Sequence, residues 1–234
     1  SSFLTPFPIM SCCFCDATPP AKATRKGVGG DAQQKMLDYQ NNPNVFAVGL
    51  KDSFCAEPGC CLISSLGAPC GLTACWARKA VLEKYEGGVD NFLCCQGYAG
   101  RMCCIEPAQY LKGSMLGLLL EGCCCPVFSL SIARLHLMDK KQVRPDPCDW
   151  QIIQCSNCLQ LISCILDIAA MFVDQLRELA LLVDLIADVF TMSVGGCMGA
   201  QVHHEIKLDA TSIVNHPVVV GVPVGAPVSQ EIAR

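Results

Sequence analysis

Cysteines carry the most evident chemistry in this sequence, because there are 20 of them among 234 residues and most stand in clusters. Cys123, Cys124 and Cys125 form an unbroken row, and Cys155 and Cys158 form a C-x-x-C pair. Two thiolates from one helical turn can converge on a zinc ion at about 2.3 Å. Thiols can also oxidise to disulfides, or pack in a core as small hydrophobes. The residues leave these three uses open.

Adjacent cysteines such as Cys94 and Cys95 seldom bond each other, but each can bond or ligate in a different direction. Such clusters are therefore suited to cross-linking neighbouring chain segments. Histidines are few and stand late in the chain, as at His203 and His204, which favours a site made of cysteines alone. We expect a cross-linking centre, holding zinc or formed by disulfides, at Cys60, Cys61, Cys70, Cys148, Cys155 and Cys158.

Motifs of known enzyme classes are missing from the sequence. It contains no GxSxG, no P-loop, no HExxH and no GxGxxG in a nucleotide-binding context. The C-x-x-C pair lacks the βαβ surroundings of a thioredoxin-like site. His136 and His203 stand near acids, and we expect both on solvated helix ends. The sequence therefore predicts a protein that is not an enzyme.

The composition points to a surface that is poor in charge. Hydrophobic residues make up 52% of the chain and charged residues 16%, against about 25% in an average protein. Such a surface is expected to contact lipid or other protein, so we expect a homo-oligomer or a large assembly. The net charge is −4 and the basic residues are scattered, which argues against nucleic acid as a partner. Cytoplasmic and membrane-associated locations both fit, and a secreted disulfide-rich filament subunit is a further alternative.

Three regions follow from changes in composition along the chain. Residues 1–59 read as an irregular arm, and residues 60–207 as a cysteine-rich helical domain. Residues 208–234 repeat Val, Pro and Gly, and we expect them to be extended because proline disfavours both helix and central strand.

Helices are the expected secondary structure of the middle region. Short ones are predicted within residues 71–88, 109–122 and 127–141. Residues 150–207 contain no proline and only three glycines, so they predict one or two long helices. These helices are apolar on most sides, and we expect them to be buried. The predicted fold class is all-α, with short cysteine-cross-linked helices packed on a long C-terminal helical hairpin and with extended tails at both ends.

For the two long apolar segments, the favourable and unfavourable contributions to the free energy of membrane insertion nearly cancel. Residues 152–173 contain one acid and residues 179–200 contain two. A central Asp costs roughly 3 kcal/mol on the insertion scale, while each Leu, Ile, Val or Phe returns about 0.3 to 0.6 kcal/mol. Both segments come out near zero, so membrane crossing stays an open alternative.

The acids of this region are regularly spaced. Asp167 and Asp174 are seven residues apart, and Asp184 and Asp188 are four apart, so each pair is predicted to share a helix face. In a membrane protein these carboxylates could line a cation path. The other interpretation is a polar stripe on a packed helix.

Two stretches resemble the placenta-specific-eight-like cysteine-rich family, which includes plant cell-number-regulator and cadmium-resistance proteins. The stretch CCLISSLGAPC, residues 60–70, is similar to the family's CC…CPC core, with Ala68 in place of the first cysteine of Cys-Pro-Cys. The stretch ARLHLMDKKQVRPDPCDWQIIQCSNCLQ, residues 133–160, matches the family in order at Arg134, Cys148, Asp149, Cys155, Cys158 and Gln160. The Arg-Glu that closes the family motif does not follow directly.

The resemblance covers roughly residues 60–160 and looks most like a longer plant and algal branch of the family. It implies a membrane-associated, self-associating protein linked to divalent metal export or growth control, without a settled catalytic activity. The first hypothesis is therefore a non-catalytic structural or interaction protein. The alternative is a membrane protein that binds or transports divalent cations.

Overall fold

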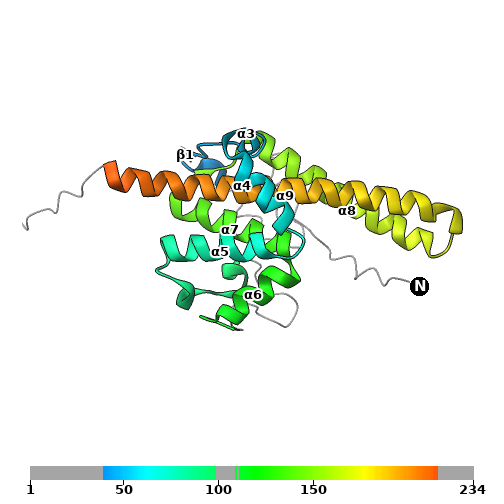
Figure 1. Ribbon diagram of the computed structural model, residues 1–234, viewed down its shortest axis with the longest axis horizontal. Coiled ribbons are helices and arrows are strands. Elements are labelled where there is room, and N and C mark those ends of the chain that lie inside the picture. The colour runs from blue at the N-terminus through cyan, green and yellow to red at the C-terminus, as the bar shows by residue number, and fades with distance from the viewer. Residues whose placement is uncertain (1–38, 99–108, 110, 216–234) are drawn as a thin grey trace, which may run out of the picture.

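The computed structural model describes residues 39–98, 109 and 111–215 (Figure 1). Helices dominate this part of the chain, which confirms the predicted all-α class with a long C-terminal helix. The α-helices of the described part are α3 Ser53–Ala56, α4 Pro58–Gly67, α5 Leu72–Tyr85, α6 Met115–Cys124, α7 Pro126–Lys141, α8 Pro147–Ala170 and α9 Arg177–Asn215.

Short elements complete the described part. The 3-10 helices are Tyr39–Asn41, Val89–Asn91, Cys94–Gly97 and Asp174–Leu176. Two two-residue strands, β1 Asn44–Val45 and β2 Val143–Arg144, pair in parallel. This pairing ties the segment before α3 to the end of α7.

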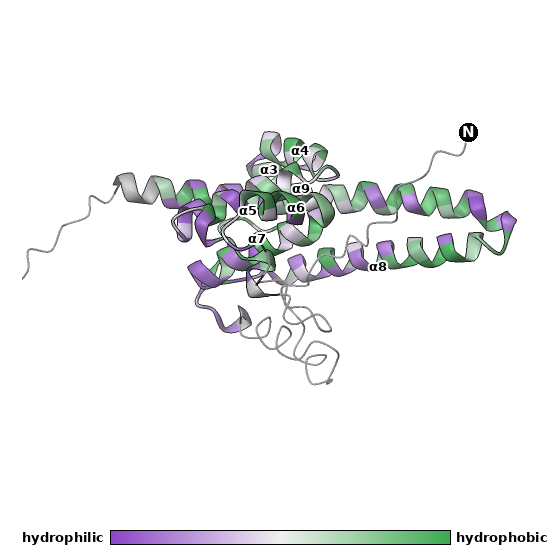
Figure 2. Cartoon of the chain, turned by 90° about the horizontal axis from the view of Figure 1, so that it is seen from below, coloured by the Kyte–Doolittle hydropathy of each residue, from purple (hydrophilic) through white to green (hydrophobic). Residues whose placement is uncertain are grey.

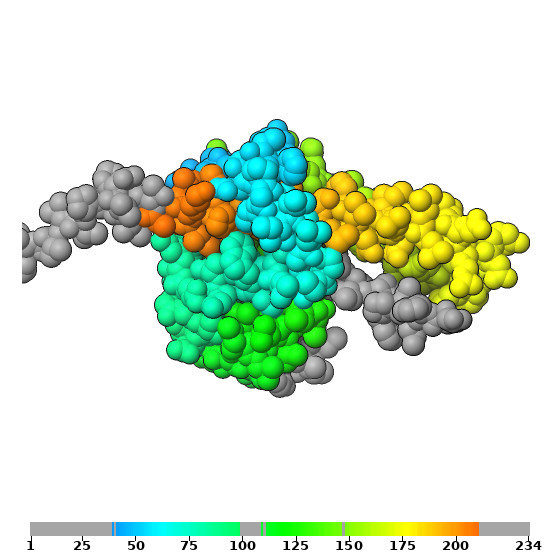
Figure 3. Space-filling model, in the orientation of Figure 1, coloured from blue at the N-terminus to red at the C-terminus, as the bar shows by residue number. Residues whose placement is uncertain are grey.

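The molecule consists of a helical body and a projecting helical hairpin. Helix α9 runs the length of the structure, and α8 lies beside its N-terminal half (Figure 1). Helices α3 and α4 contact the C-terminal half of α9, and α7, α5 and α6 lie on its other side (Figure 1). We call residues 156–193 the hairpin and the rest of the described chain the body; the space-filling view shows the hairpin extending away from the body (Figure 3).

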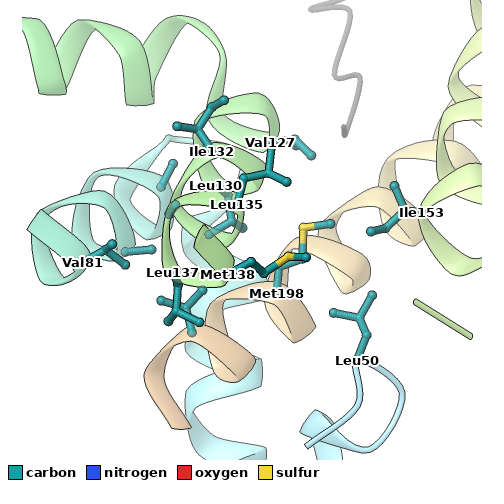
Figure 4. Close-up of a cluster of buried hydrophobic side chains, with 14 of the residues drawn as sticks. Leu50, Val81, Val127, Leu130, Ile132, Leu135, Leu137, Met138, Ile153 and Met198 are labelled. Carbon is teal, nitrogen blue, oxygen red and sulfur yellow. The ribbon is translucent and has the colours of Figure 1, made fainter. Parts of the chain in front are cut away.

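Helix α7 is the centre of the hydrophobic core. Pro126 begins the helix, where a missing N–H costs nothing, and Gln142 ends it in the left-handed conformation with a φ of 50°. Most residues between its ends are buried, because both α5 and α9 pack against it. Leu130, Leu135 and Met138 meet core residues of the neighbouring helices in this cluster (Figure 4).

Two sharp bends interrupt the helices of the body. Helices α4 and α5 are inclined by 119° and helices α6 and α7 by 120°. We call residues 68–71 the first elbow and residues 122–126 the second elbow. In the second elbow, Pro126 disfavours a helical conformation at the residue before it, and Cys125 accordingly leaves the helix with φ −137° and ψ 64°. The three-cysteine row therefore spans the end of α6 and the bend after it, and all three thiols are exposed.

The two elbows touch each other through glycines. Gly71 has a φ of +74°, and a Cβ at this position would lie 2.2 Å from the Gly122 carbonyl oxygen. A Cβ at Gly122 would lie 2.2 Å from Cys75 Sγ. Only glycine allows the backbones to approach this closely, so the elbows form one continuous surface.

Helix α4 lies against α9 through a second close contact. A Cβ at Gly196 would lie 1.8 Å from Ser65 Oγ, and one at Gly199 would lie 2.7 Å from Ser64 Oγ. The three glycines that interrupt the long apolar region thus mark the place where α4 crosses α9.

The predicted regions differ from the observed elements at their borders. Residues 39–59, expected to be irregular, contain a 3-10 helix, β1, α3 and the start of α4. Helix α9 continues to Asn215, beyond the border expected at residue 207. The short helices expected around residues 71–141 are present as α5, α6 and α7, whereas α4 was not expected. The rest of the expected N-terminal arm and C-terminal tail lies outside the described residues.

Candidate functional site

The hairpin is long and apolar enough to cross a membrane. The segments Cys148–Ala170 and Asp174–Ala210 both satisfy the length and hydropathy of a span, and up to four spans are possible if each bent helix pair counts as one. Only 17% and 33% of the residues in their most apolar windows are buried. The half of α9 within the body is buried as expected, for example at Val194, Met198 and Val202. The expectation of burial is wrong for the two helices of the hairpin. They are apolar on most sides, but protein covers only a narrow face.

The outer surface of the hairpin is formed by large apolar side chains. Figure 2 shows hydrophobic residues along both of its helices. The exposed ones are Leu161, Ile162, Ile165, Ile168, Met171, Phe172, Val173, Leu179, Leu181, Leu182, Leu185, Ile186 and Val189. A continuous apolar surface of this kind is unusual on a soluble monomer and marks contact with lipid or protein.

The fully buried positions on the inner face of the hairpin hold small residues instead, three polar and two alanines. Its buried side chains are Ser156, Ser163, Ala180, Ala187 and Thr191. The serines are seven residues apart on α8, and the α9 residues follow at intervals of seven and four. This is the spacing of the contact positions in a coiled coil, which keeps one stripe of each helix facing its partner.

Hydrogen bonds join the two helices along this stripe. Ser156 and Thr191 share one at 3.0 Å between their hydroxyl oxygens, and Gln160 Nε2 also donates to Thr191 Oγ1 at 3.0 Å. Ser163 Oγ donates to Asp184 Oδ1 at 2.8 Å. Gln160 Nε2 approaches Asp188 Oδ1 at 3.5 Å. We call these residues the polar seam: Ser156, Gln160, Ser163, Asp184, Asp188 and Thr191.

The four regularly spaced acids fall in two different settings. Asp184 and Asp188 both bond to α8 and belong to the polar seam, as their predicted common face implied. The common face predicted for Asp167 and Asp174 is wrong, because α8 ends at Ala170 and Asp174 lies in the following 3-10 turn. Within the described ranges, the four acids do not gather into a group of three possible metal ligands.

The six cysteines of the predicted cross-linking centre do not meet at one point. Cys61 is buried, and its Sγ lies 3.6 Å from the Sγ of Cys197 on α9. Across residues 39–98 and 111–215, every cysteine is a free thiol. The six are placed as follows: Cys60 and Cys61 on α4, Cys70 in the first elbow, Cys148 in the first turn of α8, and Cys155 and Cys158 on the exposed side of α8.

A different group has the arrangement of a metal site. Cys94, Cys95 and Glu121 place one ligand atom each within 4.8 Å of one another. Zinc requires thiolates. Burial raises the pKa of both thiols, and the Glu121 carboxylate raises it further. The Glu121 carboxylate already accepts from Arg78, Ser129 and the Cys95 N–H, so it serves as a structural anchor in this structure.

The Glu121 anchor joins four segments of the body. Its Oε1 accepts from Arg78 Nε at 3.0 Å and from Ser129 Oγ at 2.8 Å. Its Oε2 accepts from the Cys95 backbone N–H at 2.6 Å. Arg78 also donates to the Leu93 carbonyl at 3.2 Å. The group neutralises a buried acid and fixes the irregular chain around residue 95 to α5, α6 and α7.

A second buried ion pair lies at the junction of the body and α8. Arg134 on α7 donates from Nη2 to Asp149 Oδ2 and from Nε to Gln201 Oε1, the latter at 2.6 Å. Asp149 Oδ1 accepts from the Leu50 N–H at 2.9 Å. Arg134 and Asp149 are two of the residues on which the family resemblance depends, and the structure gives them a common role. They fix the base of the hairpin to the core.

His136 lies inside the body, so its predicted place on a solvated helix end is wrong. Its side chain is almost fully buried on α7, and Nε2 is 2.8 Å from Glu86 Oε1. Lys140 Nζ contacts the same oxygen at 2.8 Å. Burial lowers the pKa of His136 from its usual 6.5, although the hydrogen bond to Glu86 acts in the opposite direction.

This histidine predicts a loss of stability in mild acid. Its pKa is lower in the folded than in the unfolded protein, so below about 6.5 the unfolded state binds more protons and the free energy of unfolding falls. Glu86, whose pKa is lowered by the hydrogen bond from Lys140, adds a second loss below 4.5. Urea unfolding followed by tryptophan fluorescence in detergent, from neutral pH downward, measures both. In His136→Gln, the loss of stability below about pH 6.5 is expected to vanish, whereas the loss below pH 4.5 remains. A wild-type free energy of unfolding that stays constant through pH 6.5 would contradict this prediction.

Comparison with known proteins adds no relative. No protein-family model, no curated protein and no solved structure matches the chain.

Several structural residues were not singled out from the sequence. Glu121 carries a signal in retrospect, since it is the one charged residue in residues 113–133. The polar seam also carries one, because Ser156, Gln160 and Ser163 recur at intervals of four and three. Gln201 carries none, because nothing in the local sequence distinguishes it from a solvated polar residue of the long helix.

Proposed function

We propose that the protein is a non-catalytic structural component of a membrane. The hairpin inserts into the bilayer, and the cysteine-rich body rests at one membrane face within a larger assembly. The observation that carries the proposal is the reversed polarity of the hairpin. Its helices face each other with serine, threonine, glutamine and aspartate and turn leucine and isoleucine outward.

The energetics of the polar seam favour lipid over water as the surroundings. In water, the outward leucines and isoleucines would lose the burial that normally stabilises a helix pair, and the hydrogen bonds of the seam would compete with solvent. In lipid, the apolar surface is matched by hydrocarbon. Interhelical hydrogen bonds and small residues such as Ala180 and Ala187 then hold the helices together.

The dimensions of the hairpin agree with a bilayer. At about 1.5 Å per residue, the stretch of α9 within the hairpin is roughly 26 Å long. The hydrocarbon core is about 30 Å thick, and small mismatches are accommodated by local thinning. Asp174, Arg177 and Glu178 then place charges at the far interface.

Flanking charges favour an orientation with the body in the cytoplasm. Lys140, Lys141 and Arg144 precede α8, and Lys207 lies on the body half of α9. The tip of the hairpin carries Arg177 among two acids. By the positive-inside tendency, the side richer in Lys and Arg stays in the cytoplasm.

An exposed acid supports the assembly half of the proposal. Asp188 is exposed on the hairpin although it belongs to the polar seam. Ionisable residues within membrane helices nearly always face other protein or a polar cavity. We therefore expect this side of the hairpin to pack against a partner, such as a second copy of the chain.

Carbonate extraction of membranes from expressing cells tests the proposal. The wild type is expected to stay in the membrane pellet, and cross-linking of the same membranes is expected to give species larger than a monomer. Ile165→Lys with Leu185→Lys places two charges on the outer surface, each costing about 3 kcal/mol near the bilayer centre, so the protein is expected in the supernatant.

The matched control is Val45→Lys with Phe54→Lys. Both residues are exposed and apolar, and they lie in the body before α4. This variant is expected to remain in the pellet. Release of the wild type by carbonate, or retention of the hairpin variant as firm as that of the wild type, would refute insertion.

A further inference from the structure

We propose that the exposed cysteines of the two elbows are S-acylated with fatty acyl groups. The proposal rests on the proposed insertion of the hairpin, which places the elbows against the membrane. The acceptor residues are Cys70 in the first elbow and Cys123, Cys124 and Cys125 in the second.

The elbows lie where the hairpin leaves the body. A Cβ at Gly195 would lie 3.5 Å from Cβ of Ala68 in the first elbow, and Gly195 follows directly after the hairpin and Val194. The second elbow touches the first through Gly71 and Gly122. The turn between α4 and α5 accordingly appears on the side of the body from which the hairpin projects (Figures 1 and 3). A bilayer that receives the hairpin would meet this face.

The surroundings of the elbow cysteines are apolar. Leu66 on α4 and Leu119 and Leu120 on α6 are exposed on the helices that lead into the elbows. Residues 58–77 contain no charged side chain, and residues 113–133 contain only Glu121, which is buried. No charge in these two stretches would therefore be forced into the interface when the face approaches a membrane.

The thiols themselves are available for modification. All four are exposed, in contrast to the neighbouring Cys75, which is buried, although partial burial raises the pKa of Cys125 as it does that of Cys75. Cys70 Sγ and Cys123 Sγ make weak contacts with backbone carbonyls, at 3.3 Å to Gly67 and 3.9 Å to Cys70, and the Cys123 thiol also interacts with the Cys75 thiol. An acyl group can replace these contacts without disturbing the core.

The modification is a thioester exchange with a fatty acyl-coenzyme A. The cysteine thiol loses its proton, and the thiolate attacks the acyl carbonyl carbon and forms a new carbon–sulfur bond. The bond to the coenzyme A sulfur breaks, and that thiolate takes up a proton equivalent to the one lost. No oxidant or reductant is needed. The attached chains enter the leaflet at the base of the hairpin and hold the elbow face against it.

Acyl exchange on the full-length chain expressed in eukaryotic cells tests the proposal. Free thiols are blocked, thioesters are cleaved with neutral hydroxylamine, and the released thiols are labelled with a polyethylene glycol maleimide. A hydroxylamine-dependent mobility shift is expected for the wild type. In the variant with Cys70, Cys123, Cys124 and Cys125 changed to serine, the shift is expected to be lost. Serine is conservative at these exposed positions, so folding is expected to be retained.

Cys55→Ser is the matched control, because Cys55 is an exposed thiol on α3, which contacts the body half of α9. It is expected to keep the full shift. An unshifted wild type, or a shift that survives in the four-serine variant, would overturn the proposal.

Carbonate extraction of the same samples separates this proposal from hairpin insertion. If the wild type shows no mobility shift but stays in the membrane pellet, acylation is refuted and insertion is still supported. The second outcome is that the wild type shows the shift and stays in the pellet, whereas the four-serine variant loses the shift and is released by carbonate. This result supports acylation and refutes insertion. Loss of the shift with retention in the pellet supports both.

Discussion

Arg134→Met is expected to lower the free energy of unfolding by about 3–5 kcal/mol, the usual cost of removing one partner of a buried ion pair. The variant leaves the Asp149 carboxylate in the core with the Leu50 N–H and a distant Gln201 amide as its side-chain and backbone partners. Both members of the pair are almost fully buried, so water cannot replace the guanidinium. Urea titration of the purified protein in detergent measures the change.

A double variant separates the stranded charge from lost packing. Asp149→Asn keeps an oxygen that accepts from Leu50 but removes the negative charge. Combined with Arg134→Met, it is expected to recover part of the lost stability. Arg144→Ala, which removes an exposed arginine from β2, is expected to change stability by less than about 0.5 kcal/mol. A double variant that is less stable than Arg134→Met would show that the ion pair is not the cause.

Glu121→Leu is expected to have a cost of the same size, about 3–5 kcal/mol, for the opposite reason. Here the buried cation is stranded, because Arg78 keeps only neutral acceptors, the Leu93 carbonyl and the Gln96 side chain. The Ser129 hydroxyl and the Cys95 N–H also lose their acceptor. Thermal unfolding followed by circular dichroism measures the loss.

An exposed pair in the same helix provides the comparison. Lys79 and Glu83 lie one turn apart on α5 at 3.6 Å and are both exposed. Glu83→Gln is expected to change stability by less than about 0.5 kcal/mol. If Glu121→Leu costs no more than Glu83→Gln, the Glu121 carboxylate is not the anchor that its contacts indicate. Zinc analysis of the wild type would separately test whether Cys94 and Cys95 bind metal.

The helices of the body could be predicted because their limits are local. Gly87 and Gly88 follow α5, and Pro126 separates α6 from α7, so individual glycine and proline residues mark the helix ends. Helix α4 was not predicted, although Pro58 at its first position is a good helix start. The turn between α8 and α9 has neither proline nor glycine, and it depends on the two helices packing against each other.

The exposure of the hairpin could not be predicted, because an apolar helix is stable either inside a protein or in lipid. The periodicity of its sequence is the same in both settings; only the partner helix reveals that the polar stripe is the inner one. The cysteines pose the same difficulty. Their contacts, such as that between Cys61 and Cys197, join residues far apart in the chain and have no signature in local spacing.

The polar seam has a consequence for biogenesis. During synthesis α8 leaves the ribosome before α9 exists, and alone in lipid it would present Ser156, Gln160 and Ser163 without their partners on α9. Burying each of these polar side chains in lipid is unfavourable until Asp184 and Thr191 of α9 are present to form hydrogen bonds with them. If the hairpin inserts as proposed, the two helices are therefore expected to enter the bilayer as one preassembled unit. An insertion machinery that releases helices singly would have to retain the first until the second is made.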